Sequence, residues 1–237
     1  MPIFRADCHL HSCLSPCGDL DASPTRIVER AVSAGLDLVA LTDHNSALNC
    51  HTFAEAAARA GIAALYGMEA TTREEVHTLC LFETPEAAVS LGEVLYASLP
   101  DIHVDPERYG DQVYVDIDEM ILGEVEKHLI LAVEYSAEEL LEMVHERGGL
   151  FIPAHIDRSA NSMYSQLGFL PPDAYDAVEV TKWPCPLDTY DNPVISDSDA
   201  HFLPDIAQRT FTFEAETPSF GGLRTALASK QVWSSLR

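Results

Sequence analysis

The amino-acid sequence predicts an α/β fold whose parallel sheet is closed, or nearly closed, into a barrel. Apolar runs of strand length alternate with amphipathic runs of helix length along most of the chain. The run 36–42 reads as a continuous apolar strand, which is typical of a parallel sheet covered on both faces. Histidines and carboxylates recur where predicted strands end, and such barrels place their functional groups at that edge.

Local signals set the bounds of the elements. Ser23 as N-cap and Pro24 in the first turn start the first helix, and Gly35 ends it. A capping box of Ser136 and Glu139 starts a later helix. The expected helices are 25–34, 52–60, 84–98, 136–147 and 220–228. The expected strands are 3–11, 36–42, 62–66, 76–82, 150–152, 177–181, 193–196 and 210–213.

The length and composition fit one globular domain. A chain of 237 residues with 47% hydrophobic residues can bury a full core, so we expect a single domain over 1–237. The stretch 100–127 is the least regular part and carries dispersed aspartates. We interpret it as an insertion with a short hairpin, placed to act as a lid that selects the substrate.

The charge balance bears on possible partners. Lys and Arg number 14 against 38 Asp and Glu, which gives a net charge of −24. Such a surface repels polyanions, so we expect no long duplex nucleic acid and instead a small anionic phosphorylated substrate bound at metal ions. No apolar run approaches the ~18–20 residues of a membrane span, and the first residues are unlike a signal peptide. The expected location is cytoplasmic, without membrane contact, and the oligomeric state is not indicated.

A pair of histidines near the N-terminus is the first sign of a metal site. In an extended strand His9 and His11 point the same way, so both imidazoles can bind one ion. The cysteines Cys8, Cys13 and Cys17 match neither common ferredoxin spacing, so no iron–sulfur cluster is expected. The side chains at or just beyond predicted strand ends are His9, His11, His44, Glu69, His155, Asp199 and His201. So many ligand types on one rim predict a metal site.

Five motifs, in their order along the chain, resemble those of the PHP (polymerase and histidinol phosphatase) family. They are Asp7-Cys8-His9-Leu10-His11-Ser12, Leu41-Thr42-Asp43-His44-Asn45, Gly67-Met68-Glu69, Pro153-Ala154-His155 and Ser198-Asp199-Ala200-His201. The resemblance implies a distorted (β/α)7 barrel, similar to a TIM barrel, with a metal site at the carboxyl ends of the strands. It also implies three divalent ions (zinc, manganese or iron) and hydrolysis of phosphate esters.

The same resemblance implies which residues bind the metals. Those that it assigns to the first metal are His9, His11, Glu69 and Asp199. Glu69 would bridge to a second metal completed by His77 and His155. Asp7 and Asp43, beside the histidines, are expected to orient the ligands rather than to bind the ions.

The third metal would take His44, His201 and one residue of the loop after the first strand. Relatives place His or Asp at that position, and this chain departs from them. The matching residue is Cys17, and Asp19 is a nearby substitute. A thiolate is a good zinc ligand and would favour softer metals, so we prefer Cys17 to Asp19.

The expected chemistry is attack of a metal-activated hydroxide on phosphorus, with the ions neutralising the charge of the transition state. Glu69, Asp199 and His201 are the expected catalytic residues. Arg73 and Arg158 follow site motifs and are expected to bind phosphate oxygens through their planar guanidinium groups. The substrate would be a small phosphorylated metabolite or a short nucleotide.

Two other functions remain open. An amidohydrolase-type barrel also begins with a His-x-His strand, but it usually ends with a lone Asp and often bridges its metals with a modified Lys. Lys occurs here only at 127, 182 and 230, and Glu69 is available to bridge. A non-catalytic metal-binding module is the other alternative, although such a module has no need of so many ligands at strand ends.

Overall fold

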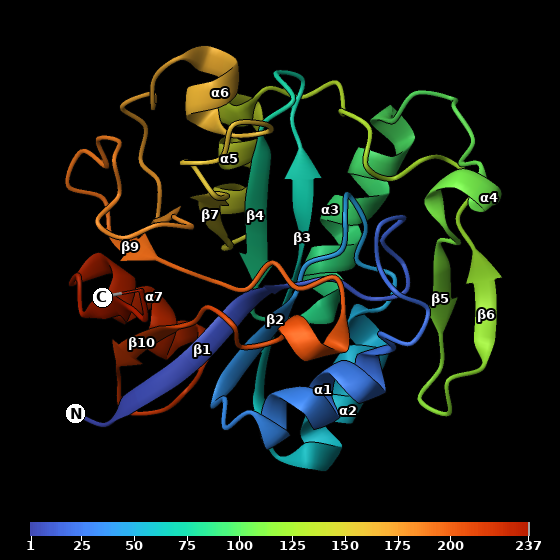
Figure 1. The fold of residues 1–237 in the computed structure, drawn as a ribbon, viewed down its shortest axis with the longest axis horizontal. Coiled ribbons are helices and arrows are strands. Elements are labelled where there is room, and N and C mark those ends of the chain that lie inside the picture. The colour runs from blue at the N-terminus through green and yellow to red at the C-terminus, as the bar shows by residue number, and fades with distance from the viewer. Residues whose placement is uncertain (237) are drawn as a thin grey trace.

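The computed structural model of the chain describes residues 1–236 and contains a curled sheet of seven strands in the order β11-β10-β1-β2-β3-β4-β7 (Figure 1). Its strands are β1 (Ile3–Leu10), β2 (Leu38–Leu41), β3 (Ala63–Thr71), β4 (His77–Phe82), β7 (Leu150–Pro153), β10 (Phe211–Glu214) and β11 (Val232–Ser234). Two short strands, β8 (Val178–Glu179) and β9 (Val194–Ile195), pair with each other outside this sheet.

The β8–β9 pair lies between the two edges of the seven-stranded sheet. On one side Ile156, just after β7, donates its N–H to the carbonyl of Glu179 at the end of β8. On the other side the hydroxyls of Ser196, after β9, and Ser234, in β11, lie 2.7 Å apart. The sheet therefore curls toward a barrel, which confirms the predicted α/β class and the tendency toward closure.

Strand direction differs from a regular (β/α)7 barrel. β1, β2 and β3 are parallel, whereas β4 is antiparallel to both β3 and β7, and β10 is antiparallel to β1 and β11. β3 continues to Thr71 instead of ending at 66, so only a short turn remains before β4. A turn that short cannot hold a crossover helix, and the next strand must run back. The sequence reading also missed β11.

The helices are α1 (Pro24–Ser33), α2 (Cys50–Ala60), α3 (Pro85–Ser98), α4 (Pro106–Tyr109), α5 (Ala137–Glu146), α6 (Met163–Leu167) and α7 (Phe220–Ala228), with a 3-10 turn η1 at Leu203–Asp205. Helices α1, α2, α3 and α5 pack against strands of the sheet from β2 to β7, whereas α7 contacts β10 (Figure 1). The predicted caps are present, because Ser23 accepts the N–H of Arg26 and Ser136 forms a reciprocal capping box with Glu139. Across residues 1–236 no helix combines the length and apolar content that crossing a bilayer requires.

Alternation along the strands divides the core into two layers. Leu38 and Leu65 belong to the inner layer, which also packs against α7, whereas Val39 and Met68 face the outer helices. Residues two apart on a strand normally share a layer. Strand alternation therefore decides which side chains can reach the interior of the barrel.

A bulge in β1 breaks this alternation next to the predicted histidine pair. Cys8 joins the inner layer and Leu10 the outer layer, although they are two residues apart. The pairing with β2 shifts register between Asp7 and Leu10, so β1 carries one extra residue there. Bulges redirect side chains beside functional sites, and this one directs His9 inward.

The stretch 100–127 contains the hairpin that the sequence predicts. β5 (Val113–Val115) and β6 (Ile121–Glu124) pair in antiparallel fashion beside α3 (Figure 1). The buried Asn49 amide anchors this hairpin, because its Oδ1 accepts the Val115 N–H at 3.0 Å and its Nδ2 donates to Ser12 Oγ at 2.9 Å. The turn and β6 are exposed to solvent, and the side chains of Ile121 and Leu122 are about 60% exposed.

We predict that Asn49→Ala lowers the free energy of unfolding by about 1–3 kcal/mol, because it leaves the buried Val115 N–H without an acceptor. Urea denaturation measures this loss, and limited proteolysis between Ile121 and Leu122 should become faster. Asn192→Ala is the control, since it removes one hydrogen bond to the Thr189 carbonyl in a different loop. Equal protection of the hairpin in both variants would contradict the anchoring role of Asn49.

Candidate metal centre

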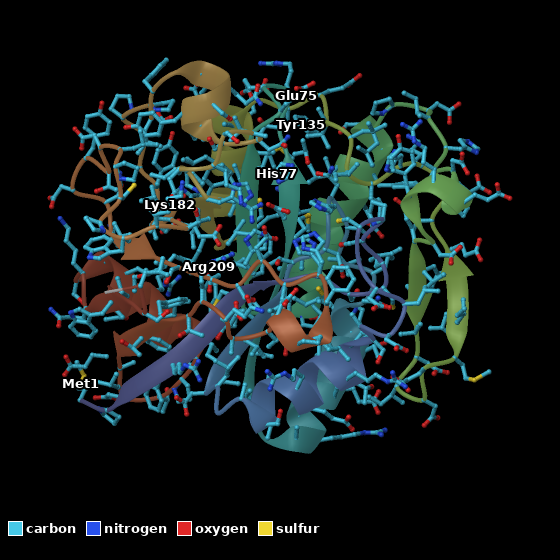
Figure 2. The ribbon with its side chains drawn as sticks, in the orientation of Figure 1. Met1, Glu75, His77, Tyr135, Lys182 and Arg209 are labelled. Carbon is cyan, nitrogen blue, oxygen red and sulfur yellow. The ribbon has the colours of Figure 1, made fainter. Side chains whose placement is uncertain are left out.

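The buried carboxylate of Glu69, on β3, lies in the middle of the polar end of the barrel. Its Oε1 is 2.8 Å from His77 Nδ1 and 3.0 Å from His155 Nε2, and its Oε2 is 3.2 Å from His44 Nδ1. Figure 2 shows His77 on β4 at the edge of a dense group of side-chain nitrogen and oxygen atoms. Leu65, four residues earlier on β3, belongs to the inner layer, so strand alternation alone directs Glu69 inward.

His9, on β1, and His11, directly after β1, reach the same group, as their spacing predicts. Their Nε2 atoms lie 3.3 and 3.2 Å from Asp199 Oδ1. The same atoms lie 3.3 and 3.4 Å from the two carboxylate oxygens of Glu69. Asp199 comes from the loop after β9, which runs along β1 because the His11 N–H donates to the carbonyl of Ala200. Residues far apart in the chain thus share one small volume.

Two residues of the cluster have a strained backbone. His155 has φ +32° and Asp199 has φ +52°, and residues other than glycine rarely adopt such values. A conformation of this kind costs of order 1–3 kcal/mol and persists only where the surroundings determine it. At His155 it turns the chain after Ala154, an inner-layer residue, so that the imidazole also reaches Glu69.

Hydrogen bonds fix the tautomers of two histidines. His9 Nδ1 lies 3.1 Å from a carboxylate oxygen of Glu179, which can only accept, so Nδ1 carries the proton. His201 Nδ1 lies 3.0 Å from the carbonyl oxygen of Asp199, which imposes the same tautomer. In both rings the lone pair is therefore on Nε2, the atom left to bind an ion.

A serine hydroxyl fixes the tautomer of a third histidine, His11. Ser15 Oγ donates to Asp43 Oδ1 at 2.7 Å and therefore accepts from His11 Nδ1 at 3.0 Å. His11 Nε2 then carries the lone pair as well. The other oxygen of Asp43 accepts from Ser12 Oγ at 2.7 Å, so Asp43 organises the loop after β1, in line with its predicted orienting role.

The donor set fits divalent metal ions. Among residues 1–236, three groups have ligand atoms within 4.8 Å of one another. These groups are His11, His44 and His201; His9, His11, Glu69 and Asp199; and His44, Glu69 and His77. Half of the buried side-chain atoms that lack a hydrogen-bond partner in this part of the chain belong to the cluster, namely His9 Nε2, His11 Nε2, His44 Nδ1, His155 Nδ1 and Asp199 Oδ1. Imidazole nitrogen and carboxylate oxygen are the ligands that zinc, manganese and iron accept.

The charge states suit this role. Burial opposes ionisation of Glu69, but His77, His9 and His44 hold the pKa of its carboxyl well below the usual range. Burial lowers the pKa of His11 to about 4 and that of His44 well below normal, so both rings are neutral at pH 7. His9 differs, because the charges of Asp199, Glu179 and Glu69 outweigh its burial and raise its pKa. The negative charges of these three carboxylates therefore favour a cation beside His9.

Cys17 and Asp19 were the alternatives for the third metal. The Asp19 carboxylate accepts the backbone N–H of Asp21 at 3.0 Å, and its own N–H donates to the carbonyl of His201. Loss of water around the Cys17 sulfur and the charges of Glu69 and Asp199 raise the pKa of the thiol to about 12. The charges of the cluster thus act on the Cys17 thiol, although Cys17 belongs to none of the three ligand groups.

The two arginines predicted to bind substrate have different surroundings. Arg158 Nη2 lies 2.5 Å from Asp199 Oδ2, and the side chain is 41% exposed, so the guanidinium stands at the mouth of the cluster. Arg73 instead donates to the carbonyl of Glu134 at 3.2 Å and lies 3.5 Å from a carboxylate oxygen of Glu139. Arg158 is therefore the arginine that touches the proposed ligands directly.

Glu179 is the residue that the sequence reading missed. It is buried at the end of β8, receives the His9 Nδ1–H, and accepts the backbone N–H of His155 at 2.8 Å. A carboxylate within the apolar run 177–181 was the available signal, since a buried charge needs a partner. Asp7, expected to orient the ligands, accepts the N–H groups of Ser198 and Ala207 and so holds the backbone of the segment that carries Asp199.

The four remaining histidines lie apart from the three ligand groups. His145 lies 2.9 Å from Asp176, and His128 packs against the ring of Tyr109, with burial lowering the pKa of its imidazole. His51 and His103 are exposed and lie near acidic neighbours.

Comparison of the sequence with known families gives a match to the PHP domain over residues 7–178. A 64-residue segment is 44% identical to an error-prone DNA polymerase of Nocardia farcinica, and it covers 27% of this chain and 6% of the polymerase. Asp199 and His201 lie outside the matched range, and it is the fold that brings them next to the residues of the other motifs.

Solved structures share the fold. Endonuclease Q in complex with a 27-mer duplex, which carries an abasic lesion at the active site, superposes with a TM-score of 0.68 at 20% identity. The alignment covers 96% of this chain and 57% of that one, so the chain spans little more than half of Endonuclease Q. An amidohydrolase from Chromobacterium violaceum with bound sulfate gives a TM-score of 0.57 at 20% identity, over 93% of this chain and 96% of the other.

These findings correct the expected partners. The net charge of −24 predicts that long duplex nucleic acid is excluded and that a small phosphorylated substrate is favoured. That inference is wrong, because a protein of this fold has been solved with duplex DNA at its active site. The physical reason is screening: charges beyond about 8–10 Å contribute little in physiological salt, so the ions and side chains at the site decide which phosphate can bind.

We predict that Glu179→Gln lowers metal affinity about 10- to 100-fold, because the amide no longer stabilises the His9 Nδ1–H as a carboxylate does. Titration with zinc or manganese, followed by elemental analysis after dialysis, measures this loss. Glu142→Gln, an exposed position on α5, is the matched control. Unchanged metal content in Glu179→Gln would argue against this support of His9.

Proposed function

Because the chain belongs to the PHP (polymerase and histidinol phosphatase) family of metal-dependent hydrolases, we propose that it cleaves phosphodiester bonds in nucleic acid. One observation carries the proposal: a cluster of buried histidines around Glu69 and Asp199 opens beside the exposed guanidinium of Arg158. Such a site offers metal ligands together with a guanidinium group that can donate hydrogen bonds to a phosphate. The fold shared with Endonuclease Q supports nucleic acid as the substrate class.

The metals would be held by three overlapping sets of side chains. The residues proposed for the first ion are His9, His11, Glu69 and Asp199, and those for the second are Glu69, His77 and His155. The residues proposed for the third are His44, His201 and Cys17, since the Asp19 carboxylate is already used in a local turn. Divalent ions bound there would lower the pKa of a bound water, and their positive charge would stabilise the transition state of phosphoryl transfer.

The protein's own groups orient and polarise the substrate. Arg158 holds Asp199 with one nitrogen and has further N–H donors for a non-bridging phosphate oxygen. His201, with a side chain 23% exposed, is the most open histidine of the cluster and faces the entry side. Glu69, Asp199 and His201 are the residues that we propose to be catalytic, because they surround the place where phosphorus would react.

An amidohydrolase with a lysine bridge has less support. Lys127 donates to the carbonyls of Tyr96 and Leu99, and Lys230 pairs with Asp191. The carboxylate oxygens of Glu69 lie within 3.4 Å of five histidines, so Glu69 is available to bridge two ions instead. Buried histidines with preset tautomers likewise favour catalysis over a module that only binds a partner.

We predict that Asp199→Asn abolishes metal-dependent cleavage, with a loss of at least about 100-fold in kcat/KM, because a ligand charge and the partner of Arg158 are both removed. The assay follows fluorescent single-stranded, duplex and abasic duplex oligonucleotides with added manganese or zinc. Elemental analysis gives the bound metal in parallel.

Asp101→Asn is the matched control, since its side chain is 89% exposed and contacts only His103. Wild-type protein that binds two or three metals yet cleaves none of these oligonucleotides would refute the proposed substrate class. Wild-type protein without any bound transition metal would refute the site itself.

For Arg158→Ala we predict at least a tenfold rise in KM for an oligonucleotide, with partial recovery in Arg158→Lys, because a point charge replaces only part of a two-pronged contact. Arg73→Ala provides the comparison, since its guanidinium is held by Glu134 and Glu139. A similar rise in Arg73→Ala would assign phosphate binding to Arg73 as well. Unchanged KM in Arg158→Ala would remove Arg158 from the proposal.

A further inference from the structure

The segment that follows β8 lies on the rim of the metal cluster. β8 ends at Glu179, which contacts His9. Thr181 then donates both its N–H and its hydroxyl to Asp157 Oδ1, at 2.8 and 3.1 Å. Asp157 immediately precedes Arg158. These bonds hold the segment against the β7 loop, so the residues after Thr181 begin beside the proposed phosphate ligand.

Lys182, the next residue, has a free cationic head. Its side chain is exposed, and no residue in 1–236 accepts a hydrogen bond from it or pairs with its charge. Every other Lys or Arg in that range contacts a carboxylate, a carbonyl or hydroxyl oxygen, or an aromatic ring. In a chain with 38 acidic residues, a lysine without a protein partner is poised for an external anion.

Trp183 comes next and is 37% exposed. Tryptophan is uncommon at the surface, and this chain has only two. An indole face beside a cation is the arrangement by which proteins bind single-stranded nucleic acid, with the base on the ring and the phosphate on the charge. Stacking of this kind tolerates any base sequence, because every base has a π-face.

We propose that Lys182 and Trp183 form a nucleotide subsite next to the metal cluster, in which Trp183 stacks on an unstacked base and Lys182 binds its phosphate. This inference rests on the proposed function and sharpens it. The substrate would be a strand with an exposed base, either a single strand or a duplex that is locally disrupted at the cleavage site. Arg158 and Lys182 would then contact successive phosphates along that strand.

Fluorescence tests the stacking directly. The background variant is Trp233→Phe, which leaves Trp183 as the only tryptophan. The metal-loaded protein is mixed in a stopped-flow instrument with an eight-nucleotide single strand, and emission is read before turnover. The comparison probe is a strand of equal length in which abasic tetrahydrofuran units replace every nucleoside. We expect quenching by the base-bearing strand and none by the abasic strand.

Affinity measurements separate the two residues. Trp183→Ala should weaken binding of the base-bearing strand about 5- to 100-fold and leave the abasic strand unaffected, since only stacking is lost. Lys182→Gln should weaken binding of both strands and reduce the salt dependence of log Kd by about 0.7, the value for one phosphate contact on a single strand. Lys230→Gln, which removes a lysine already paired with Asp191, is the control.

Equal quenching by the two strands, or unchanged affinity of Trp183→Ala for the base-bearing strand, would overturn the subsite. The proposed function fails separately, if the wild type cleaves no phosphodiester under any metal condition while quenching by the base-bearing strand persists. Cleavage that continues with the wild-type KM in Trp183→Ala would overturn only the subsite.

Discussion

The buried carboxylate of Glu69 is the constraint on which this structure depends. A charge at this depth would cost several kcal/mol or more if it were unpaired. Five histidines surround it: His9 in β1, His11 directly after β1, and one each from the loops or strands after β2, β3 and β7. The arrangement is stable only if the strands that deliver these rings remain in register. Curling of the sheet and pairing of the Glu69 charge therefore depend on each other.

A second layer of buried acids connects the last motif to the first strand. Asp197 accepts the N–H of Cys8 at 2.6 Å, and Asp7 accepts the N–H of Ser198 at 3.0 Å, so each segment holds the backbone of the other. Burial raises the pKa of Asp7 to about 6 and that of Asp197 well above normal. Part of the acidic composition of this chain is thus structural, and a divalent cation nearby would offset its electrostatic cost.

The net charge of −24 misled the expectation about partners because it sums groups that act on different scales. Acids in the interior fix ligands, and surface acids far from the rim are screened by salt. Arg158 lies at the mouth of the cluster, where it is exposed and in contact with Asp199. Lys182 follows Thr181 on the same rim. We therefore expect the local charge at the mouth, rather than the total, to decide which anions can approach.

Local sequence patterns were enough to predict the α/β class, most helices and strands, and the histidine and carboxylate motifs, because hydrophobic periodicity and strand alternation are local properties. Period-two alternation predicts that His9 and His11 share a direction and that Glu69 shares a face with Leu65, whereas the inward direction of the histidine pair depends on the bulge in β1. The sequence could not reveal the antiparallel turn of β4, the bulge in β1 or the left-handed backbone of His155 and Asp199. Glu179, the pairing of Arg158 with Asp199, and the rim position of Lys182 were decided only by the tertiary structure, since each depends on contacts between segments that are distant in the chain.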